Sequence, residues 1–486
     1  MSRGGRSSTY VSLTAAETGL KFVFTALCIV ICGCVRYVAQ PPQLAEHSRL
    51  LQERRLDDAD IASKMTDGLA ARGTRPWPPA HYGMADLLAA AIVLNPDLAE
   101  ARAQLAVAAA GTKTARALPN PTIGLALDHY LHAQSQDSPW LWGITIDLLI
   151  DTATQRRLRI SLAQTQVQGA RLDYAERLWQ VRHDLNAALN DSRIGARQLH
   201  LAEQAVAKAT ALNQAIALRV QAGEAASGEQ LQTQLAVAKA LQDEAAARQR
   251  TATAQGKLAR ALGLSVAAVM DISLQEPNLS LAIVSEPQRW GPARELALLS
   301  RPDLERALAD YNAREIELHQ QVRAQYPQLS IGPGYTYDHG FRRLTLNMSF
   351  SLPVFNRNEG PIAQAQALRE AAGLQLEAVQ ATILTQVDSA YAALQQAVHS
   401  LDAARRQREL SEQVSGETQT AYDAGIADRV ALLNAQLAGF AAAQTELQAV
   451  DQMLQAAANL EDALRTPLDA EELALASVPE SQHQTR

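Results

Sequence analysis

The residues best suited to covalent chemistry in this chain are three cysteines, and all of them lie near its start. They are Cys28, Cys32 and Cys34, within or just after one short apolar stretch. Since no cysteine follows, the rest of the sequence excludes a disulfide framework, a cysteine zinc site and a cysteine nucleophile. The chemistry that remains for these thiols is modification close to the beginning of the chain.

The sequence around these cysteines is organised like an export signal. Basic residues precede the apolar run Phe22–Ile31, which is shorter than the ~20 apolar residues that cross a bilayer. The following Cys32-Gly33-Cys34 resembles a bacterial lipobox, in which small residues precede a lipid-modified cysteine. This resemblance implies a lipoprotein signal peptide over residues 1–33 and covalent lipid on Cys34, with no other cofactor. An ordinary cleaved signal with incidental cysteines is the alternative.

The residue two positions after Cys34 bears on which membrane would hold the lipid. It is Arg36, whereas an aspartate there retains such lipoproteins in the inner membrane, so the resemblance favours the outer membrane. Several acyl chains anchor a protein stably where one chain does so only marginally. We therefore interpret residues 34–85 as a lipidated N-terminal extension.

The remaining sequence lacks the residue patterns of common catalytic sites. It contains no Gly-rich phosphate loop, no His-Glu-x-x-His and no Gly-x-Ser-x-Gly. Among its scattered histidines, His183 is directly followed by the carboxylate of Asp184, and on a long helix a solvated or interhelix contact fits this pair better than a site. A net charge of −7 argues against a nucleic-acid partner. We expect no enzyme activity, no catalytic residue and no metal site.

The body of the chain is an internal duplication. Four features recur in the same order and at nearly constant spacing: a helix opening with Pro-Asp-Leu, a proline before a strand-like run, an Ala-Gly turn and a Leu-x-x-Gln. They begin at Pro96, Pro121, Ala222 and Leu231 in the first copy and at Pro302, Pro327, Ala424 and Leu433 in the second. The sequence therefore predicts a first repeat over 86–263, a linker over 264–292, a second repeat over 293–465 and a tail over 466–486.

Each repeat predicts a helix, two strands, a long helix, a tight turn and a further helix. The expected elements of the first repeat are Asp86–Ala117, Thr122–Leu131, Trp140–Leu149, Arg156–Gln221 and Gly228–Leu262. Those of the second repeat are Ala293–Gln325, Leu329–Asp338, Arg343–Leu352, Ile362–Ala424 and Asp428–Arg465. The longest helices would extend ~100 Å at ~1.5 Å per residue.

The composition and spacing of apolar residues predict how these helices pack. Hydrophobic residues make up 47% of the sequence but aromatic residues only 5%, so most apolar side chains are small or aliphatic. Apolar residues recur at spacings of three and four, which indicates a coiled-coil stripe. An intracellular coiled coil is the alternative, and it would leave both the export signal and the strands unexplained.

The predicted strands alternate between apolar residues and small or polar ones. Every second residue from Trp140 to Leu148, and again from Leu344 to Leu352, is apolar. Strands of ~10 residues with apolar-out and polar-in alternation are typical of outer-membrane barrels. Near the loop ends stand residues suited to an aromatic girdle, namely Tyr130, Trp140, Trp142, Tyr335, Tyr337 and Phe341. One face of a soluble sandwich is the alternative.

Four strands are too few to close a membrane barrel. Membrane barrels need at least ~8 strands, and an open edge in lipid leaves backbone groups unpaired. The chain must therefore oligomerise. Two copies would give a narrow barrel filled by side chains and three a wider one. The small, polar inward set of residues favours an open lumen.

The ordered set of these features resembles the outer-membrane efflux protein family, the TolC-like channels. It includes the duplicated unit, the Pro121 and Pro327 strand starts, the two Ala-Gly turns and the segment Leu352–Gly360 that leads into a helix. The resemblance covers about residues 80–465 and is nearest to lipoprotein members that serve heavy-metal efflux. It implies a mainly α protein with transmembrane β structure.

The same resemblance implies an assembly and its partners. Three copies would complete a 12-stranded β-barrel in the outer membrane and a periplasmic α-barrel tunnel. The tunnel would dock onto a periplasmic adaptor and an inner-membrane pump of the resistance-nodulation-division type. The chain itself would be a passive duct.

The resemblance also implies two functional regions at the helix hairpin tips. Residues Ala222, Gly223, Glu224, Ala424, Gly425 and Ile426 would meet the adaptor. A gate just inside the second tip would consist of Tyr422, Asp428 and Arg429. Family members carry aspartates where this sequence has Ala431 and Asn434, so the gate departs from the family pattern, and solvated charges are the alternative.

The sequence leaves the cargo open. The lipobox and the Leu-Pro-Val-Phe-Asn-Arg-Asn segment resemble members paired with heavy-metal pumps, and multidrug export is the second possibility. A trimeric structural or adhesin-like outer-membrane lipoprotein, and a monomeric periplasmic scaffold, are alternatives of a different class.

Overall fold

The computed structural model describes residues 37–70, 77–131, 139–151, 153–275, 290–338 and 341–468. The predicted signal peptide, the lipidation site Cys34 and the tail after residue 468 lie outside the described residues. The chain divides into two compact units, one ending at Leu51 and the other formed by Gln52–Arg486. Helix α2 (Leu44–Glu53) begins in the first unit, and the second contains both repeats.

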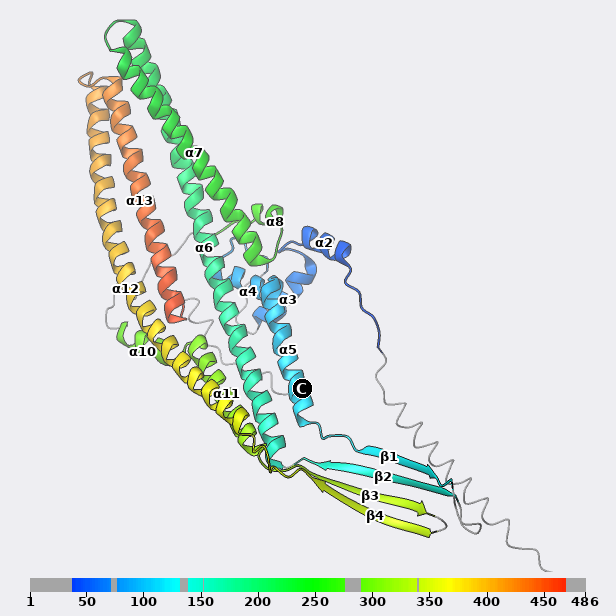
Figure 1. Cartoon of the computed structure of the whole chain (residues 1–486). Helices are drawn as coiled ribbons and strands as arrows, with labels where there is room; N and C mark the ends of the chain where they lie inside the picture. Colours follow the sequence, from blue (N-terminus) through cyan, green and yellow to red (C-terminus); the bar gives the residue numbers. More distant parts are fainter. Residues whose placement is uncertain are drawn as a thin grey trace, which may run out of the picture. The chain divides into compact units, whose positions relative to one another are not determined.

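The two repeats have the same order of elements. The first consists of α4 (Met84–Leu94), α5 (Pro96–Arg116), β1 (Thr122–His129), β2 (Trp140–Ile150), α6 (Ala153–Gln221) and α7 (Ser227–Leu262). The second consists of α10 (Trp290–Ser300), α11 (Pro302–Arg323), β3 (Leu329–Asp338), β4 (Phe341–Phe350), α12 (Glu359–Asp423) and α13 (Arg429–Leu464). This order confirms the predicted duplication (Figure 1).

The first helix of each repeat is broken at a proline, which corrects the single helices predicted over 86–117 and 293–325. Proline lacks an N–H and fixes φ, so it starts a helix well but interrupts one. At Pro96 the break is capped, because the side-chain oxygen of Asn95 accepts hydrogen bonds from the N–H groups of Asp97 (2.8 Å) and Leu98 (3.1 Å). Each repeat therefore begins with a short helix that turns into a longer one.

The predicted linker 264–292 also contains regular structure. Helix α8 (Val266–Met270) starts at Ser265, whose hydroxyl accepts from the N–H of Ala268 at 3.3 Å. Further along, Leu274 forms a parallel bridge with Tyr82, which lies in the predicted extension 34–85 together with helices α2 and α3 (Ala59–Ala70). The linker and part of the extension therefore pack with the first repeat.

The core is made of Leu, Ala and Val side chains between helices, as the composition predicted. One cluster joins α4, α6 and α7 and includes Leu87, Leu185 and Leu258. A second cluster joins α12 and α13 through residues such as Leu394 and Leu460. In Figure 1 the hairpins α6–α7 and α12–α13 run side by side, and the strands adjoin the ends of α6 and α12 opposite the hairpin turns. No described helix has both the length and the low polarity needed to cross a membrane.

The four strands form one antiparallel sheet in the order β1-β2-β3-β4. The two repeats meet in its middle, where Leu141 pairs with Asp338 and Ile150 with Leu329. Strand β1 ends at His129 rather than the predicted Leu131, and β4 covers 341–350 rather than 343–352. Within the described chain, β1 and β4 each have one edge without a neighbouring strand.

Candidate channel wall, gate and hairpin tips

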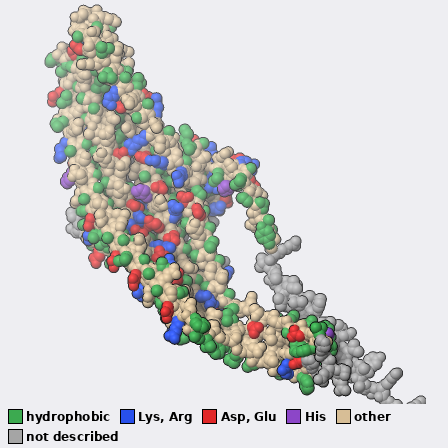
Figure 2. Space-filling view, viewed as in Figure 1, with side chains coloured by type: hydrophobic (Ala, Val, Ile, Leu, Met, Phe, Trp, Pro, Cys, Tyr) green, Lys and Arg blue, Asp and Glu red, His purple; other side chains and the backbone are tan. Residues whose placement is uncertain are grey.

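Strand β2 shows the predicted division of the sheet into two faces. Trp140, Trp142 and Ile144 are exposed apolar residues, whereas the alternating Gly143 and Thr145 are covered or half-covered. In the edge strands β1 and β4 both sets of side chains are largely exposed, because nothing in the described chain packs on them. Charged side chains are dense over the middle of the helices and sparse over the sheet on the face shown in Figure 2.

The face opposite the apolar set is lined by small residues in register. Gly124, Thr145, Gly334 and Thr345 are direct partners in one row across all four strands. A Cβ atom on Gly124 would lie 2.6 Å from the hydroxyl oxygen of Thr145, and one on Gly334 would lie 2.7 Å from that of Thr345. The glycines therefore give each threonine side chain room to lie flat along the sheet.

Aromatic residues cluster toward the loop end of the strands, as predicted. The ring of Trp142 lies 5.5 Å from that of Tyr335 and 5.9 Å from that of Tyr337. His129 and Trp140, the last residue of β1 and the first of β2, pack edge to face at 4.4 Å. Clustered aromatic rings are typical of a membrane–water boundary, where the surroundings are apolar on one side and aqueous on the other.

The two hairpin tips have the same backbone. Gly223 and Gly425 adopt φ of 76° and 72°, a left-handed conformation that favours glycine. In the first tip the N–H of Glu224 donates to the carbonyl of Arg219, and in the second the N–H of Ile426 donates to that of Ala421, each at 2.8 Å. This is the Schellman end of a helix, and it explains the repeated Ala-Gly pair.

The tip side chains predicted to meet an adaptor point into solvent. Ala222, Gly223 and Glu224 are exposed in the first tip, and Ala424, Gly425 and Ile426 are exposed in the second. Ile426 is a large apolar residue without cover in the described chain. The surface of these residues is therefore accessible, and their contact with an adaptor stays a prediction.

Among the predicted gate residues, Asp428 makes the polar contacts. One of its carboxylate oxygens accepts from the N–H of Ala431 at 2.7 Å and so caps α13, while the other lies 2.6 Å from Nη2 of Arg219 on α6. The backbone hydrogen bond and the guanidinium together lower the pKa of Asp428, and the carboxylate raises the pKa of Arg219.

The other two predicted gate residues are not brought into this contact. Tyr422 is 38% exposed and Arg429 is exposed, and neither side chain has a hydrogen bond or ion pair within the described ranges. Sequence reasoning missed Arg219, which lies 209 residues from Asp428 in the chain. No local pattern could have paired two residues so far apart; only their shared position one turn from each hairpin tip indicates it.

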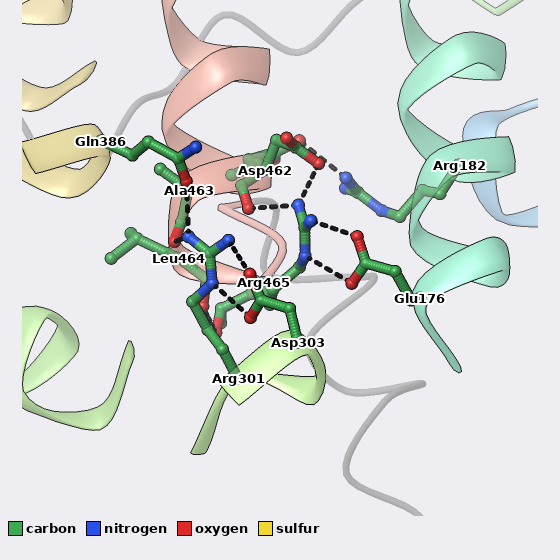
Figure 3. A network of polar contacts seen from close by, with 11 residues as sticks. Glu176, Arg182, Arg301, Asp303, Gln386, Asp462, Ala463, Leu464 and Arg465 are labelled. Atoms are coloured by element: carbon green, nitrogen blue, oxygen red, sulfur yellow. Dashed lines mark hydrogen bonds and ion pairs between the residues drawn. The ribbon is translucent and has the colours of Figure 1, made fainter. Parts of the chain in front are cut away.

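A buried polar network joins the repeats far from the tips (Figure 3). Arg182 of α6 donates from Nη1 to Oε2 of Glu461 on α13 at 2.9 Å, and both side chains are almost completely buried. Arg465, just after α13, forms two hydrogen bonds with Glu176 of α6, at 3.2 and 2.5 Å. The network fixes the end of α13 on the middle of α6.

Arg301 extends this network at the break between α10 and α11. Its guanidinium donates to the carbonyl of Ala463 (2.7 Å), to Gln386 (3.2 Å) and to Asp303 (2.6 and 3.0 Å). Arg301 therefore occupies the position that Asn95 occupies in the first repeat, where the amide of Asn95 donates to the carbonyl of Ala261 at 2.8 Å. Both repeats use the residue before the proline to reach the end of their last helix.

The histidine–carboxylate pair found in the sequence does not form. Nδ1 of His183 is buried without a hydrogen-bond partner in the described part of the chain, and Asp184 is exposed. Nor do His, Cys, Asp or Glu side chains gather in threes suitable for a metal ion within the residues that the structure describes.

Comparison with known proteins matches this arrangement. A family model described as outer membrane efflux protein matches the chain twice, over residues 87–264 and 293–464. No curated protein sequence matches the chain.

Solved structures share the fold at low sequence identity. The outer-membrane channel OprN is 16% identical with a TM-score of 0.66, the match covering 89% of this chain and 99% of OprN. VceC from Vibrio cholerae is 17% identical with a TM-score of 0.64, covering 79% of this chain and 97% of VceC. CusC is 14% identical with a TM-score of 0.63, covering 88% of this chain and 99% of CusC. Because the family model spans both repeats and these channels share their fold, the chain belongs to the outer membrane efflux protein family.

Proposed function

We propose that this chain is the exit duct of a tripartite efflux system, a homotrimer that crosses the outer membrane. The observation that carries the proposal is a sheet with an exposed apolar face and two free edges, attached to two long helical hairpins. In lipid a free strand edge leaves its N–H and C=O groups unpaired, so the sheet must continue into other copies. Three copies make a barrel of twelve strands.

The inner face of the sheet supports a wide lumen. An eight-stranded barrel from two copies would be filled by its own side chains, whereas a larger barrel encloses a channel. The row of Gly124, Thr145, Gly334 and Thr345 keeps side chains flat against the wall. The small residues of this row leave room for an aqueous path along the inner face.

Transport through this duct is driven by its partners. A periplasmic adaptor would contact the exposed tips around Gly223 and Gly425, and an inner-membrane pump of the resistance-nodulation-division type would deliver the cargo. The cargo class that we propose is heavy-metal cations, with multidrug export as the second possibility. Acyl chains on Cys34 would hold the start of the chain at the same membrane.

The contact between Arg219 and Asp428 is the part of the proposed gate that the geometry supports. It ties the end of α6 to the start of α13, so it holds the two hairpins together at the tips. Releasing it would let the second hairpin move away from the first and widen the tunnel entrance. Among the described residues Tyr422 and Arg429 have no hydrogen-bond or ion-pair partner, and we propose that they act across copies in the trimer.

Channel recordings test the gate. In planar bilayers, Arg219→Ala and Asp428→Ala should each raise the closed-state conductance, because either change removes the tie between the hairpins. Arg429→Ala distinguishes a gate held by contacts within one chain from a gate held also by contacts between copies. Only in the second case should this variant raise the closed-state conductance. Closed-state conductance equal to that of the unmodified protein in all three variants would contradict the gate.

Two measurements test the proposed duct: the mass of the purified assembly and the loss of cargo export after deletion of the protein. The purified protein should sediment in detergent as a trimer and form pores, and its deletion should sensitise cells to the cargo of the associated pump. A chain that stays monomeric in detergent and forms no pores would contradict the proposed function.

A further inference from the structure

A short segment after β4 carries large apolar side chains that nothing in the described chain covers. Leu352 and Val354 are 69% and 67% exposed, and Phe355 is fully exposed. Hydrophobic side chains standing together in water are unfavourable, and a contiguous patch of them usually marks a contact surface. This segment lies where the sheet passes into helix α12.

The segment is held in a defined conformation. The N–H of Val354 donates to the carbonyl of Leu352 at 2.9 Å, and the N–H of Asn358 donates to the side-chain oxygen of Asn356 at 2.8 Å. Nδ2 of Asn358 also donates to the carbonyl of Gln321 on α11 at 2.8 Å. Phe355 is therefore presented by a turn that is fixed at both ends, which lowers the entropy lost when its side chain is buried.

A cavity of about 280 Å³ lies at the same end of the strands, beside the start of β1, the end of β2 and the start of β3. The residues just before β1 and at the end of β2 line it, among them Leu118, Pro119, Leu149 and Ile150. One wall is polar, where Nη2 of Arg159 lies 2.5 Å from a carboxylate oxygen of Asp151. Its volume can hold an aromatic side chain, whose ring would contact the apolar part of the lining.

The strand directions bring these two features together between copies. Successive strands of the sheet are antiparallel, so β1 and β4 run in opposite directions. When β4 of one copy pairs with β1 of the next in a closed up-and-down barrel, the end of β4 lies beside the beginning of β1. The segment that follows Phe350 then lies beside the residues that precede Thr122 in the neighbouring copy.

From this geometry we infer that Phe355 of each copy inserts into the Leu118–Ile150 cavity of the next copy and locks the trimer where sheet and helices meet. The occupant is a second copy of this chain, and the inference rests on the proposed trimer. Phe355 does not fill the cavity of its own chain, since its side chain is fully exposed. The cavity is thus completed by a residue that only the neighbour supplies.

Cysteine cross-linking between copies tests the contact directly. The full-length protein carrying Phe355→Cys together with Leu118→Cys should give covalent dimers and trimers on a gel under non-reducing conditions, and each single variant should not. A pair within one chain would leave the mass unchanged. The matched control is Phe341→Cys with Leu118→Cys, because Phe341 lies at the opposite end of β4, about 30 Å away at ~3.4 Å per residue.

The oligomeric state, measured by sedimentation in detergent, separates failure of the contact from failure of the trimer. A trimer that cross-links through 355 and 118 but not through 341 and 118 supports the inference. A trimer that fails to cross-link through 355 and 118 overturns it and leaves the proposed function standing. A monomer overturns both.

A second variant compares the two aromatic residues of this strand region. Phe355→Ala should lower the temperature at which the trimer dissociates in SDS by several degrees more than Phe341→Ala does, although both residues are exposed in one chain. If Phe355 instead contacts lipid, a spin label at position 355 will be accessible to oxygen in vesicles but not to a polar nickel complex. That result would overturn the inference.

Discussion

The two repeats are joined by ion pairs at two levels, and these levels differ in burial. In the middle, the side chains of Arg182 and Glu461 are 7% and 9% exposed, whereas at the tips those of Arg219 and Asp428 are 37% and 50% exposed. A buried pair is costly to break because the remaining charge stays in a medium of low polarity. An exposed pair exchanges readily with water and salt. An arginine–carboxylate ion pair is therefore a fixed connection where it is buried and a releasable contact where it is exposed.

A second set of ion pairs, which is only partly buried, also lies near the middle. Arg250 of α7 contacts both Asp191 of α6 (3.0 Å) and Asp451 of α13 (2.7 Å), and Lys257 reaches Asp191 at 2.9 Å. Burial alone would raise the pKa of Asp191, but the hydrogen bonds from Lys257 and Arg250 more than offset it and lower that pKa. Three helices from both repeats are therefore connected at this height.

The largest expected effect comes from breaking the middle joint. Arg182→Ala leaves the Glu461 carboxylate buried and without its guanidinium, which should cost about 3–5 kcal/mol of stability. The measurement is chemical unfolding followed by circular dichroism. Arg177→Ala is the matched control, because Arg177 is on the same helix, and its hydrogen bond among the described residues is an exposed one to Gln180. Equal stability of the two variants would remove the distinction between the levels.

Acid should release the tip contact between Arg219 and Asp428. The pKa of Asp428 lies below its ordinary value of 3.8 in the folded protein, so the contact stabilises the closed tips fully above that value and is lost as the pH falls through the lowered pKa. Closed-state conductance should stay constant from pH 7 to pH 5 and rise below about pH 4. The pH profile of Asp428→Asn, which cannot titrate, should be flat in the same range. A rise that begins near pH 6 would point to other groups.

The smallest effect comes from making the first tip like the second. Ala226 is the residue before α7 and provides no side-chain cap, whereas the equivalent Asp428 caps α13. Ala226→Asp should stabilise the start of α7 by about 0.5–1 kcal/mol. Hydrogen exchange of residues 227–230 would report it as slower exchange. Ala222→Asp adds the same charge at the end of α6, where the helix dipole disfavours it, so faster exchange there is expected.

Local patterns in the sequence predict most of the elements. The alternation in 140–149, the Ala-Gly turns and the matching order of the two repeats gave the strands, tips and duplication, because each depends on residues close together in the chain. The breaks at Pro96 and Pro302 were missed although Asn95 before Pro96 is a typical capping residue. The prediction favoured continuous apolar spacing over the stronger effect of a proline.

The ion pairs between the repeats could not be predicted, because their residues lie far apart in the sequence. Arg182 and Glu461 are 279 residues apart, and nothing in either local sequence distinguishes them from charges on a solvated helix face. Their burial arises only when α13 packs on α6. The same holds for Arg219. In the sequence it is an ordinary basic residue in the last turn of α6, and its contact with Asp428 forms only when the second hairpin packs beside the first.

The pairing of β2 with β3 has a consequence for biogenesis. These two strands are adjacent in the sheet but about 180 residues apart in the chain, as Ile150 pairs with Leu329. During synthesis the first repeat is made long before its central partner strand, so β2 keeps an unpaired edge until residue 329 has been added. A polypeptide that ends before residue 329 therefore cannot complete its sheet, and its exposed strand edge is open to pairing with other chains.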